Sequence, residues 1–175
     1  MQHTLIALVE DKPGVLNRVA SLFRRRAFNI DSLTVGHTET PGISRMTIVV
    51  NSDEVSAERV VANLYKLVNV IQVDDLGRMA AVSRDLAMVK VSANSLNRIE
   101  IMQLVDVFRA RIVDVANDSL IIEITGDEDK IDSFVDVLRP YGIIEMVRTG
   151  VVAMARGAQA LPDTSLASAG SLVAV

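Results

Sequence analysis

The segment VEDKPGVLNRVASLF, residues 9–23, contains the transition that decides the fold. An apolar run at 3–10 ends in charged residues, and Pro13 and Gly14 follow before apolar residues begin to recur at helical spacing. Proline is favoured at the first position of a helix, where its missing N–H would have no partner, so Pro13 is predicted as the first helical residue. The segment therefore predicts a strand, a tight turn and a helix in direct succession.

The residues up to position 76 complete one structural unit around that helix. Residues 28–39 alternate between apolar and polar, and 43–50 form another apolar run after a Pro-Gly turn, which predicts two further strands. Asp53 favours a second helix start, and 69–76 is predicted as a short closing strand. The predicted order is β-α-β-β-α-β.

The second half of the chain repeats this order. Asn97, with Glu100 three residues later, resembles a capping box at a helix start, and Asp127 opens another helix. Two copies of the split βαβ unit predict an α+β protein with two ferredoxin-like βαββαβ domains. The strands expected here are at 86–93, two within 110–126, and an extended segment at 143–155.

The domain limits follow from these elements. We expect a first domain at 1–76 and a second at 86–157, joined by a linker at 77–85. The remaining residues, 158–175, are mostly Ala, Ser, Gly and Leu without periodicity, so we expect a poorly ordered tail.

One face of the first sheet is expected to be too apolar for solvent. Ile6, Leu8, Ile48 and Val50 would lie there beside residues that already point toward the helices. An exposed apolar sheet face needs cover, which a second copy of the chain would supply. We therefore expect an obligate homodimer.

Composition limits the classes of protein to which the chain can belong. Of the 175 residues 50% are hydrophobic, only 3% are aromatic and none is cysteine, which excludes disulfides, thiolate metal sites and cysteine nucleophiles. The net charge of −4 and the lack of aromatics in the central strands disfavour RNA binding, and no apolar run approaches the roughly 18 residues of a membrane helix. We expect a cytoplasmic protein that binds neither nucleic acid nor membrane.

No catalytic motif is apparent. His3 and His37 lack metal-ligand spacing, so each is predicted as an ordinary strand residue. The acidic groups at 74–75 and 127–129 fail the calcium-loop pattern. An acylphosphatase-type hydrolase would need a phosphate-cradling loop with an arginine, whereas EDKPG offers acids. We therefore expect no catalytic residue and no metal site on this chain.

Three arginines at 24–26 close the first helix. Cations at a helix C-terminus interact favourably with the macrodipole, so solvated capping charge is one explanation. A contact patch for an acidic partner surface is the other.

The turn at 11–16 has the features of a small-ligand site. Unpaired N–H groups at a helix start attract a carboxylate, and Gly14 would let a ligand approach the backbone closely. Asp11, Asn29 and Asp31 could accept hydrogen bonds from an ammonium. This set suits a small aliphatic amino acid, although on spacing alone a plain βα turn explains the same residues. The residues expected as an apolar wall are Ile30, Leu33 and Val35.

Three longer motifs carry a resemblance to a known family. They are D-x-P-G-V-L at 11–16, R-R-x-F-N-I-D-S-L-T-V at 25–35 and S-R-M-T-I at 44–48. These segments closely resemble the ACT domain of the small, regulatory subunits of acetolactate (acetohydroxyacid) synthase. The likeness continues to about residue 157 and leaves only the tail outside.

The resemblance implies a regulator without its own active site. In that family the large catalytic subunit holds thiamine diphosphate, magnesium and FAD, so no cofactor is expected on this chain. The small subunit raises the activity of the large one and confers feedback inhibition by valine, the end product of branched-chain amino acid biosynthesis. A free-standing ACT-domain amino-acid sensor that regulates another enzyme is the alternative.

The resemblance also implies where the effector binds. Valine is expected between two ACT domains of a homodimer. By their match to the family's effector loop, Asp11, Gly14, Val15 and Leu16 are assigned to one side of the site. Asn29 and Ile30 match the facing segment, which comes from the other protomer. Some relatives have asparagine where this chain has Asp11, so an added carboxylate bears on valine sensitivity.

Overall fold

The structure, a computed structural model, describes residues 1–157, which form two compact units. Among the described residues, unit 1 contains 1–82 and 153–157, and unit 2 contains 83–152. The last strand thus returns to unit 1, because extended residues near 153 pair with the start of the strand that leaves it. The segment 77–85, expected as a linker, holds part of a 3-10 turn and the start of a strand. The predicted tail lies outside the described residues.

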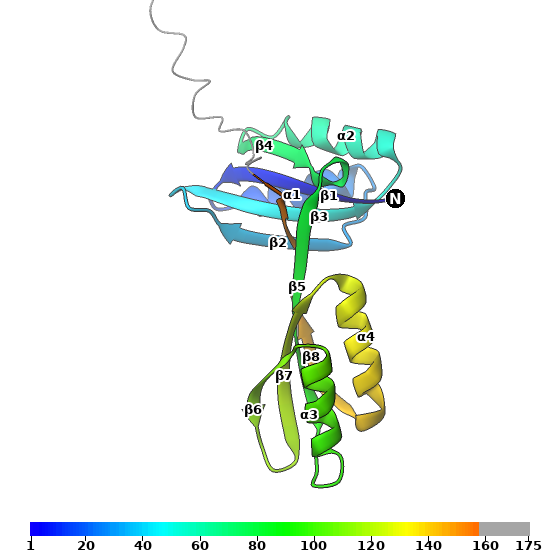
Figure 1. The fold of residues 1–175 in the computed structure, drawn as a ribbon. Helices are drawn as coiled ribbons and strands as arrows, with labels where there is room; N and C mark the ends of the chain where they lie inside the picture. Colours follow the sequence, from blue (N-terminus) through cyan, green and yellow to red (C-terminus); the bar gives the residue numbers. More distant parts are fainter. Residues whose placement is uncertain (158–175) are drawn as a thin grey trace, which may run out of the picture. The chain divides into compact units, whose positions relative to one another are not determined.

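Unit 1 has the β-α-β-β-α-β order that its sequence predicts. Its four strands form an antiparallel sheet in the order β2-β3-β1-β4, the ferredoxin-like arrangement, as Figure 1 shows. The predicted strand at 28–39 is shorter than expected, because residues 28–31 approach the sheet without pairing as a strand. The elements are β1 (Gln2–Glu10), α1 (Val15–Arg25), β2 (Ser32–His37), β3 (Ile43–Asn51), α2 (Glu54–Leu64) and β4 (Val70–Asp75).

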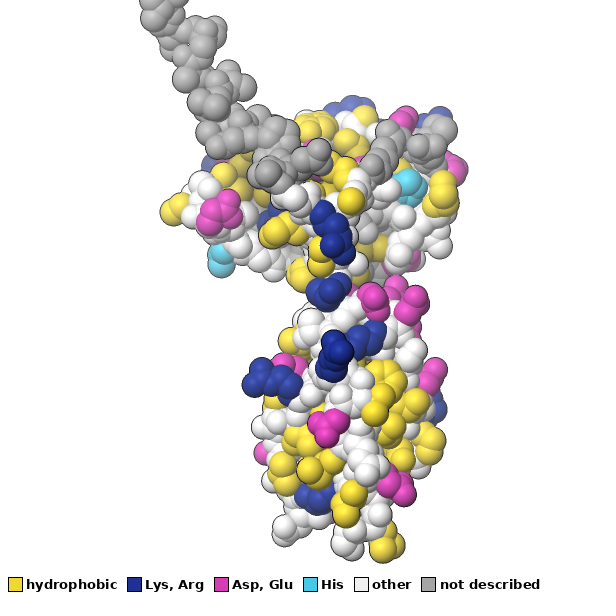
Figure 2. Space-filling model, viewed as in Figure 1, with side chains coloured by type: hydrophobic (Ala, Val, Ile, Leu, Met, Phe, Trp, Pro, Cys, Tyr) yellow, Lys and Arg dark blue, Asp and Glu magenta, His cyan; other side chains and the backbone are white. Residues whose placement is uncertain are grey.

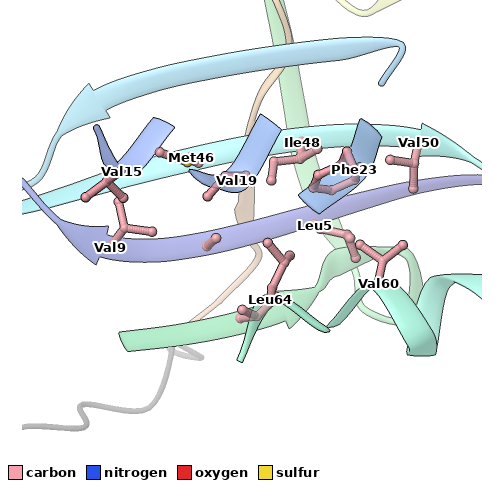
Figure 3. Packing of buried hydrophobic residues seen from close by; sticks show 12 residues of the cluster. Leu5, Val9, Val15, Val19, Phe23, Met46, Ile48, Val50, Val60 and Leu64 are labelled. Atoms are coloured by element: carbon pink, nitrogen blue, oxygen red, sulfur yellow. The ribbon is translucent and has the colours of Figure 1, made fainter. Parts of the chain in front are cut away.

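The core of unit 1 lies between the sheet and both helices. In α1 the buried side chains Val15, Val19 and Phe23 recur every four residues, which places them on one face of the helix. Figure 3 shows these residues against Leu5 of β1 and Ile48 of β3, with α2 closing the same core. Burying one such side chain contributes about 1.5–3 kcal/mol, so this aliphatic stripe fixes the position of α1.

The prediction of an exposed apolar face on the first sheet is wrong in two respects. Ile48 and Val50 point toward the helices and belong to the core, not to the opposite face. Ile6 does lie on the opposite face, since it alternates with Leu5, yet it is already fully buried within the single chain. On that face Arg45 donates a hydrogen bond of 2.7 Å from Nη2 to the Ala153 carbonyl. Ala153 of the last strand therefore contacts this face, and Ile6 needs no second copy to be buried. The homodimer itself stays a prediction.

Unit 2 repeats the same order, with strands arranged as β6-β7-β5-β8 and β9 pairing with β5. Its helices bury Ile101 and Phe134 against the sheet. The extended segment expected at 143–155 is divided into β8 and β9, because residues 149–151 interrupt it. The elements of unit 2 are β5 (Ala81–Ser92), α3 (Arg98–Val107), β6 (Arg111–Val115), β7 (Ser119–Gly126), α4 (Glu128–Leu138), the 3-10 turn η2 (Arg139–Tyr141) and β8 (Ile143–Arg148). The 3-10 turn η1 (Leu76–Arg78) and, from Ala153, β9 (Val152–Ala155) belong to unit 1.

Exposed hydrophobic side chains are frequent on unit 2. Figure 2 shows them in yellow around its helices. Helix α3 is apolar on its outer side as well as on its buried side. The exposed residues at and near α3 are Leu96, Ile99, Met102 and Val107.

Two helices begin where their sequence predicts. The Asp53 side chain caps α2 by accepting a 2.7 Å hydrogen bond from the Ser56 N–H, which lowers the pKa of Asp53. The Asp127 side chain caps α4 by accepting a 3.0 Å hydrogen bond from the Lys130 N–H. In both cases a carboxylate satisfies an N–H that the helix itself leaves unpaired.

Two other predicted helix starts differ in the structure. Asn97 precedes α3, but its Oδ1 accepts a 2.8 Å bond from the Asn94 N–H and caps no helical N–H, so the capping box with Glu100 is wrong. The Asn94 side chain in turn accepts from the N–H groups of Leu96 at 2.8 Å and Asn97 at 3.2 Å, which forms an Asx-type turn before α3. Pro13 lies before the helix, because Gly14 occupies the cap position and α1 begins at Val15.

The C-terminal end of α1 contains strained backbone. Ala27 has φ 56°, in the left-handed region, and its N–H donates to the Arg24 carbonyl at 3.2 Å. The Phe28 N–H donates to the Phe23 carbonyl at 3.1 Å, and the two rings pack edge to face with centroids 6.5 Å apart. These bonds form a Schellman motif, whose left-handed position glycine usually occupies.

Ala27→Gly is therefore expected to stabilise unit 1 by about 0.5–1 kcal/mol, because glycine adopts the left-handed conformation without steric cost. The same substitution at exposed Ala20, within α1, should destabilise it by about 1 kcal/mol, since glycine disfavours helix interiors. Denaturant titration of both variants measures the two effects. If both substitutions lowered the free energy of unfolding equally, the inference that the backbone at Ala27 is strained would be wrong.

Candidate functional site

The turn between β1 and α1 presents open backbone at a helix start. Gly14 has φ 84° and ψ −6°, provides no side-chain cap, and a Cβ placed there would have no atom of the chain within 4 Å. The Val15 N–H donates to Lys12 at 3.3 Å, whereas the amides of Leu16 and Asn17 have no acceptor among residues 1–157. Such N–H groups, with the positive end of the helix dipole, favour an anionic group.

The predicted residues of this turn contribute in different ways. Val15 is buried in the core, with 4% of its side chain exposed, so it can offer a ligand only its backbone. Leu16 is 46% exposed and could contact an apolar group. The Asp11 N–H donates to the Gly42 carbonyl at 2.8 Å, which fixes the start of the turn beside β3. Asp11, Gly14, Val15 and Leu16 therefore lie together.

His37 is a neighbour of this turn that its sequence did not indicate. Its Nδ1 lies 3.3 Å from Oδ2 of Asp11, and both side chains are exposed. The contact forms because β2 ends beside the β1–α1 turn, and only strand register reveals that. The Asp11 carboxylate thus has a partner of its own within the chain.

Asn29 and Ile30 lie at the other end of α1. Asn29 Nδ2 donates to Oδ1 of Asp31 at 3.0 Å, and Ile30 packs partly against the core. The Asp31 N–H donates to the carbonyl of Val49, at the far end of β3 from Gly42. The strand between these ends spans roughly 20 Å. A single chain therefore does not bring Asn29 or Asp31 to Asp11. The assignment of Asn29 and Ile30 to the facing segment of another protomer stays a prediction.

The two edges of the unit 1 sheet differ in their availability. At the β4 edge the Tyr65 hydroxyl accepts a hydrogen bond from the Val73 N–H and donates one to the Val73 carbonyl, both at 3.0 Å. These bonds occupy backbone groups that another strand would need. At the β2 edge, β3 pairs along one side of Ser32–His37 and the other side is an edge. The β2 edge is thus the better place for strand addition.

Within residues 1–157, no three His, Cys, Asp or Glu side chains are placed to hold a metal ion. His3 lies in β1, where its Nδ1 is 3.1 Å from Oδ2 of Asp75 in a largely buried pair. No helix in the same part of the chain is long and apolar enough to cross a membrane.

The chain was compared with known protein families and structures. Residues 5–72 match the model for the AHAS small subunit-like ACT domain, and residues 84–157 match the model for the small subunit of acetolactate synthase. The chain belongs to the acetolactate synthase small-subunit family. The resemblance seen in the sequence motifs is confirmed, and unit 1 contains the family's ACT domain.

Relatives of this family match over most of their length. The "Probable acetolactate synthase small subunit" of Archaeoglobus fulgidus is 55% identical over 157 residues, covering 90% of this chain and 98% of that protein. The acetolactate synthase small subunit of Mycolicibacterium smegmatis is 50% identical over 155 residues, covering 89% and 91%. The crystal structure of the acetolactate synthase small subunit from Thermotoga maritima aligns with a TM-score of 0.84 at 43% identity, covering 90% of this chain and 98% of that one. The α+β fold of the small-subunit family is therefore confirmed.

Proposed function

We propose that this chain is a regulatory subunit that activates the catalytic subunit of acetolactate synthase and makes it sensitive to valine. The observation that carries the proposal is the open turn at Gly14, where two helix-start amides lack acceptors among residues 1–157. Thiamine diphosphate, magnesium and FAD are assigned to the catalytic subunit and not to this chain. Family membership supports the catalytic subunit as the partner, and the open turn supports the position of the effector site.

A homodimer would complete that site. When two β2 edges pair around a two-fold axis, the strands run antiparallel, and the start of one β2 lies beside the end of the other. Asn29 and Ile30 precede the start of β2, whereas Asp11 lies at its end beside His37. Pairing of two β2 edges would therefore bring Asn29 and Ile30 of one copy close to Asp11 of the other, although these residues lie far apart within one chain.

The chemistry of the site matches a small amino acid. The amides of Leu16 and Asn17 would bind the carboxylate of valine, and Gly14 would leave room for it. Asn29 of the second copy, or Asp11, would accept hydrogen bonds from the ammonium. The isopropyl group would pack on Leu16 and on Ile30 of the second copy. Valine would then shift the population of subunit conformations that activate the catalytic subunit, by as much as it prefers one of them.

Calorimetric titration of the full chain with L-valine tests the effector. Saturable binding is expected for valine, with leucine, isoleucine and serine titrated alongside to define the side-chain preference. Repeating the titration with the catalytic subunit present would detect binding to a site that forms only in the complex. Absence of valine binding in both titrations would overturn the effector assignment.

Co-purification tests the enzyme that is regulated. The chain is expected to form a stable complex with the thiamine-dependent catalytic subunit and to raise its rate of acetolactate formation. Valine binding without any complex would favour the alternative, a free-standing ACT-domain sensor of another enzyme.

A further inference from the structure

A groove between α1 and α2, which we call the basic groove, lies on the outer side of unit 1. It has a volume of about 370 Å³. Its cations are Arg18, Arg25 and Arg26 from α1 and Lys66 just after α2, and its lining contains no carboxylate. The groove is thus strongly positive within a chain whose net charge is −4. The other lining residues are Asn17, Ser21, Leu22, Asn63 and Leu67.

The floor of the groove is apolar. Leu22 and Leu67 are each only partly buried against the core of unit 1, so part of each side chain faces the groove. A small inorganic anion would satisfy the cations but would leave these leucines in water. The lining therefore suits a ligand that carries apolar and acidic groups together.

Hydrogen bonds position one end of the groove. Arg18 donates to Oδ1 of Asn69, which is 8% exposed, and Asn69 Nδ2 donates to Oε2 of Glu10 at 2.5 Å. The hydrogen bond from Asn69, with a further one from Lys12, lowers the pKa of Glu10, which keeps that carboxylate ionised and the chain of bonds oriented. Arg18 is consequently held at the groove by a neutral amide, and its charge stays available.

The other cations also keep their charge available. Lys66 Nζ donates to Oδ1 of Asn63 at 3.2 Å, again an amide. Arg25 and Arg26 form no ion pair with any described side chain of residues 1–157. Favourable interaction with the helix dipole explains why Arg25 and Arg26 lie at the C-terminus of α1. It does not explain why these arginines and Lys66, which follows α2, line the same groove with two leucines.

We propose that the basic groove is a docking site for an acidic amphipathic segment of the catalytic subunit, whose apolar side chains cover Leu22 and Leu67 while its carboxylates pair with the rim. The identity of the partner rests on the proposed function. The proposed dimer pairs β2 edges and does not use the α2 side of the groove, because α2 packs beside β4, at the opposite edge of the sheet.

A second copy of the chain is a poorer occupant. Its most acidic helix is α4, whose exposed Asp132 and Asp136 already pair with Arg148 and Arg139. The apolar stripe of α4 is buried in its own core. Such a helix would leave the leucines of the floor uncovered.

Charge reversal within one helical turn tests the docking site. Arg25→Glu removes a groove cation, and Arg24→Glu is the matched control, because Arg24 is the neighbouring exposed cation in the same turn and does not line the groove. Both variants change the helix-dipole interaction alike. The dissociation constant for the purified catalytic subunit is measured at two salt concentrations, together with valine binding and dimer state.

Arg25→Glu is expected to weaken binding of the catalytic subunit at least about tenfold, because it places a carboxylate against the partner's carboxylates. Arg24→Glu should stay within about twofold of wild type, because Arg24 does not line the groove. Leu22→Ser should weaken it as well without changing the salt dependence. If wild type binds and the two charge reversals bind equally, the groove is not the docking site. If Arg25→Glu alters the dimer and leaves the catalytic-subunit affinity unchanged, a second copy occupies the groove and the proposal is overturned. If wild type itself fails to bind the catalytic subunit, the proposed function falls first, and the docking proposal with it.

Discussion

Gly14→Asp is expected to abolish the response to valine while activation of the catalytic subunit persists. The new carboxylate would stand at the N-terminus of α1, where the ligand's carboxylate is proposed to bind, and would both fill the open space and repel it. Losing two charge-assisted hydrogen bonds, each worth about 1.5–3 kcal/mol, corresponds to an affinity at least about 100-fold lower. Aspartate is favourable at a helix cap and tolerates the left-handed conformation, so unit 1 should still fold.

Gly14→Asn is the matched control, since asparagine has the same size and backbone tolerance without the charge. It should weaken valine binding less than aspartate does. Calorimetry gives the affinities, and acetolactate formation by the reconstituted enzyme gives activation and inhibition separately. Full valine inhibition of the Gly14→Asp enzyme would place the site elsewhere.

Mixing variants tests whether the site is built from two chains. Gly14→Asp and Asn29→Ala subunits should each bind valine poorly on their own. Random exchange makes about half of the dimers mixed, and a mixed dimer has one intact site of two, so about a quarter of the wild-type capacity should return. A site contained within one chain would recover nothing.

Arg148→Met is expected to have the largest effect on stability. Arg148 donates to Oδ2 of Asp85 from Nε at 2.8 Å and from Nη2 at 2.6 Å, and to Oδ1 of Asp132 from Nη1 at 2.8 Å. Asp85 is 5% exposed, so loss of Arg148 would leave a buried carboxylate without its partner. Removing one member of a buried pair typically costs about 3–5 kcal/mol, and unit 2 should unfold at much lower denaturant concentration.

A double variant separates pairing from packing. Asp85→Leu together with Arg148→Met removes both charges and should be less destabilised than Arg148→Met alone, because no unpaired charge remains buried. Burial lowers the pKa of Arg148, but hydrogen bonds and attraction from Asp85 and Asp132 outweigh it, so its pKa is raised. With respect to the titration of Arg148, this contribution is fully present below the usual arginine pKa and is lost as pH rises through the raised pKa. A cost below about 1 kcal/mol for Arg148→Met would show that the pair does not hold unit 2 together.

Local patterns predicted the elements because their causes are local. The four-residue recurrence of Val15, Val19 and Phe23 requires only the helical period, and Asp53 and Asp127 cap helices by reaching N–H groups a few residues on. Where several local partners compete, the sequence is ambiguous. Asn97 bonded back to Asn94 and not forward into α3, and both outcomes satisfy the same side chain.

The sequence by itself determined the family, through its motifs. It also determined the two repeats of β-α-β-β-α-β and the aliphatic core, because the spacing of apolar residues and the residues at turns select helices and strands through contacts between near neighbours. Only the tertiary structure decided which strands end beside one another. That arrangement places His37 against Asp11 and buries Ile6 within the single chain. It also brings the Tyr65 hydroxyl to the β4 edge, where it hydrogen-bonds the backbone of Val73. It also separates Asn29 from Gly14 by the length of a strand. The reason is physical: strand register and sheet order depend on contacts between distant residues, which no local pattern specifies.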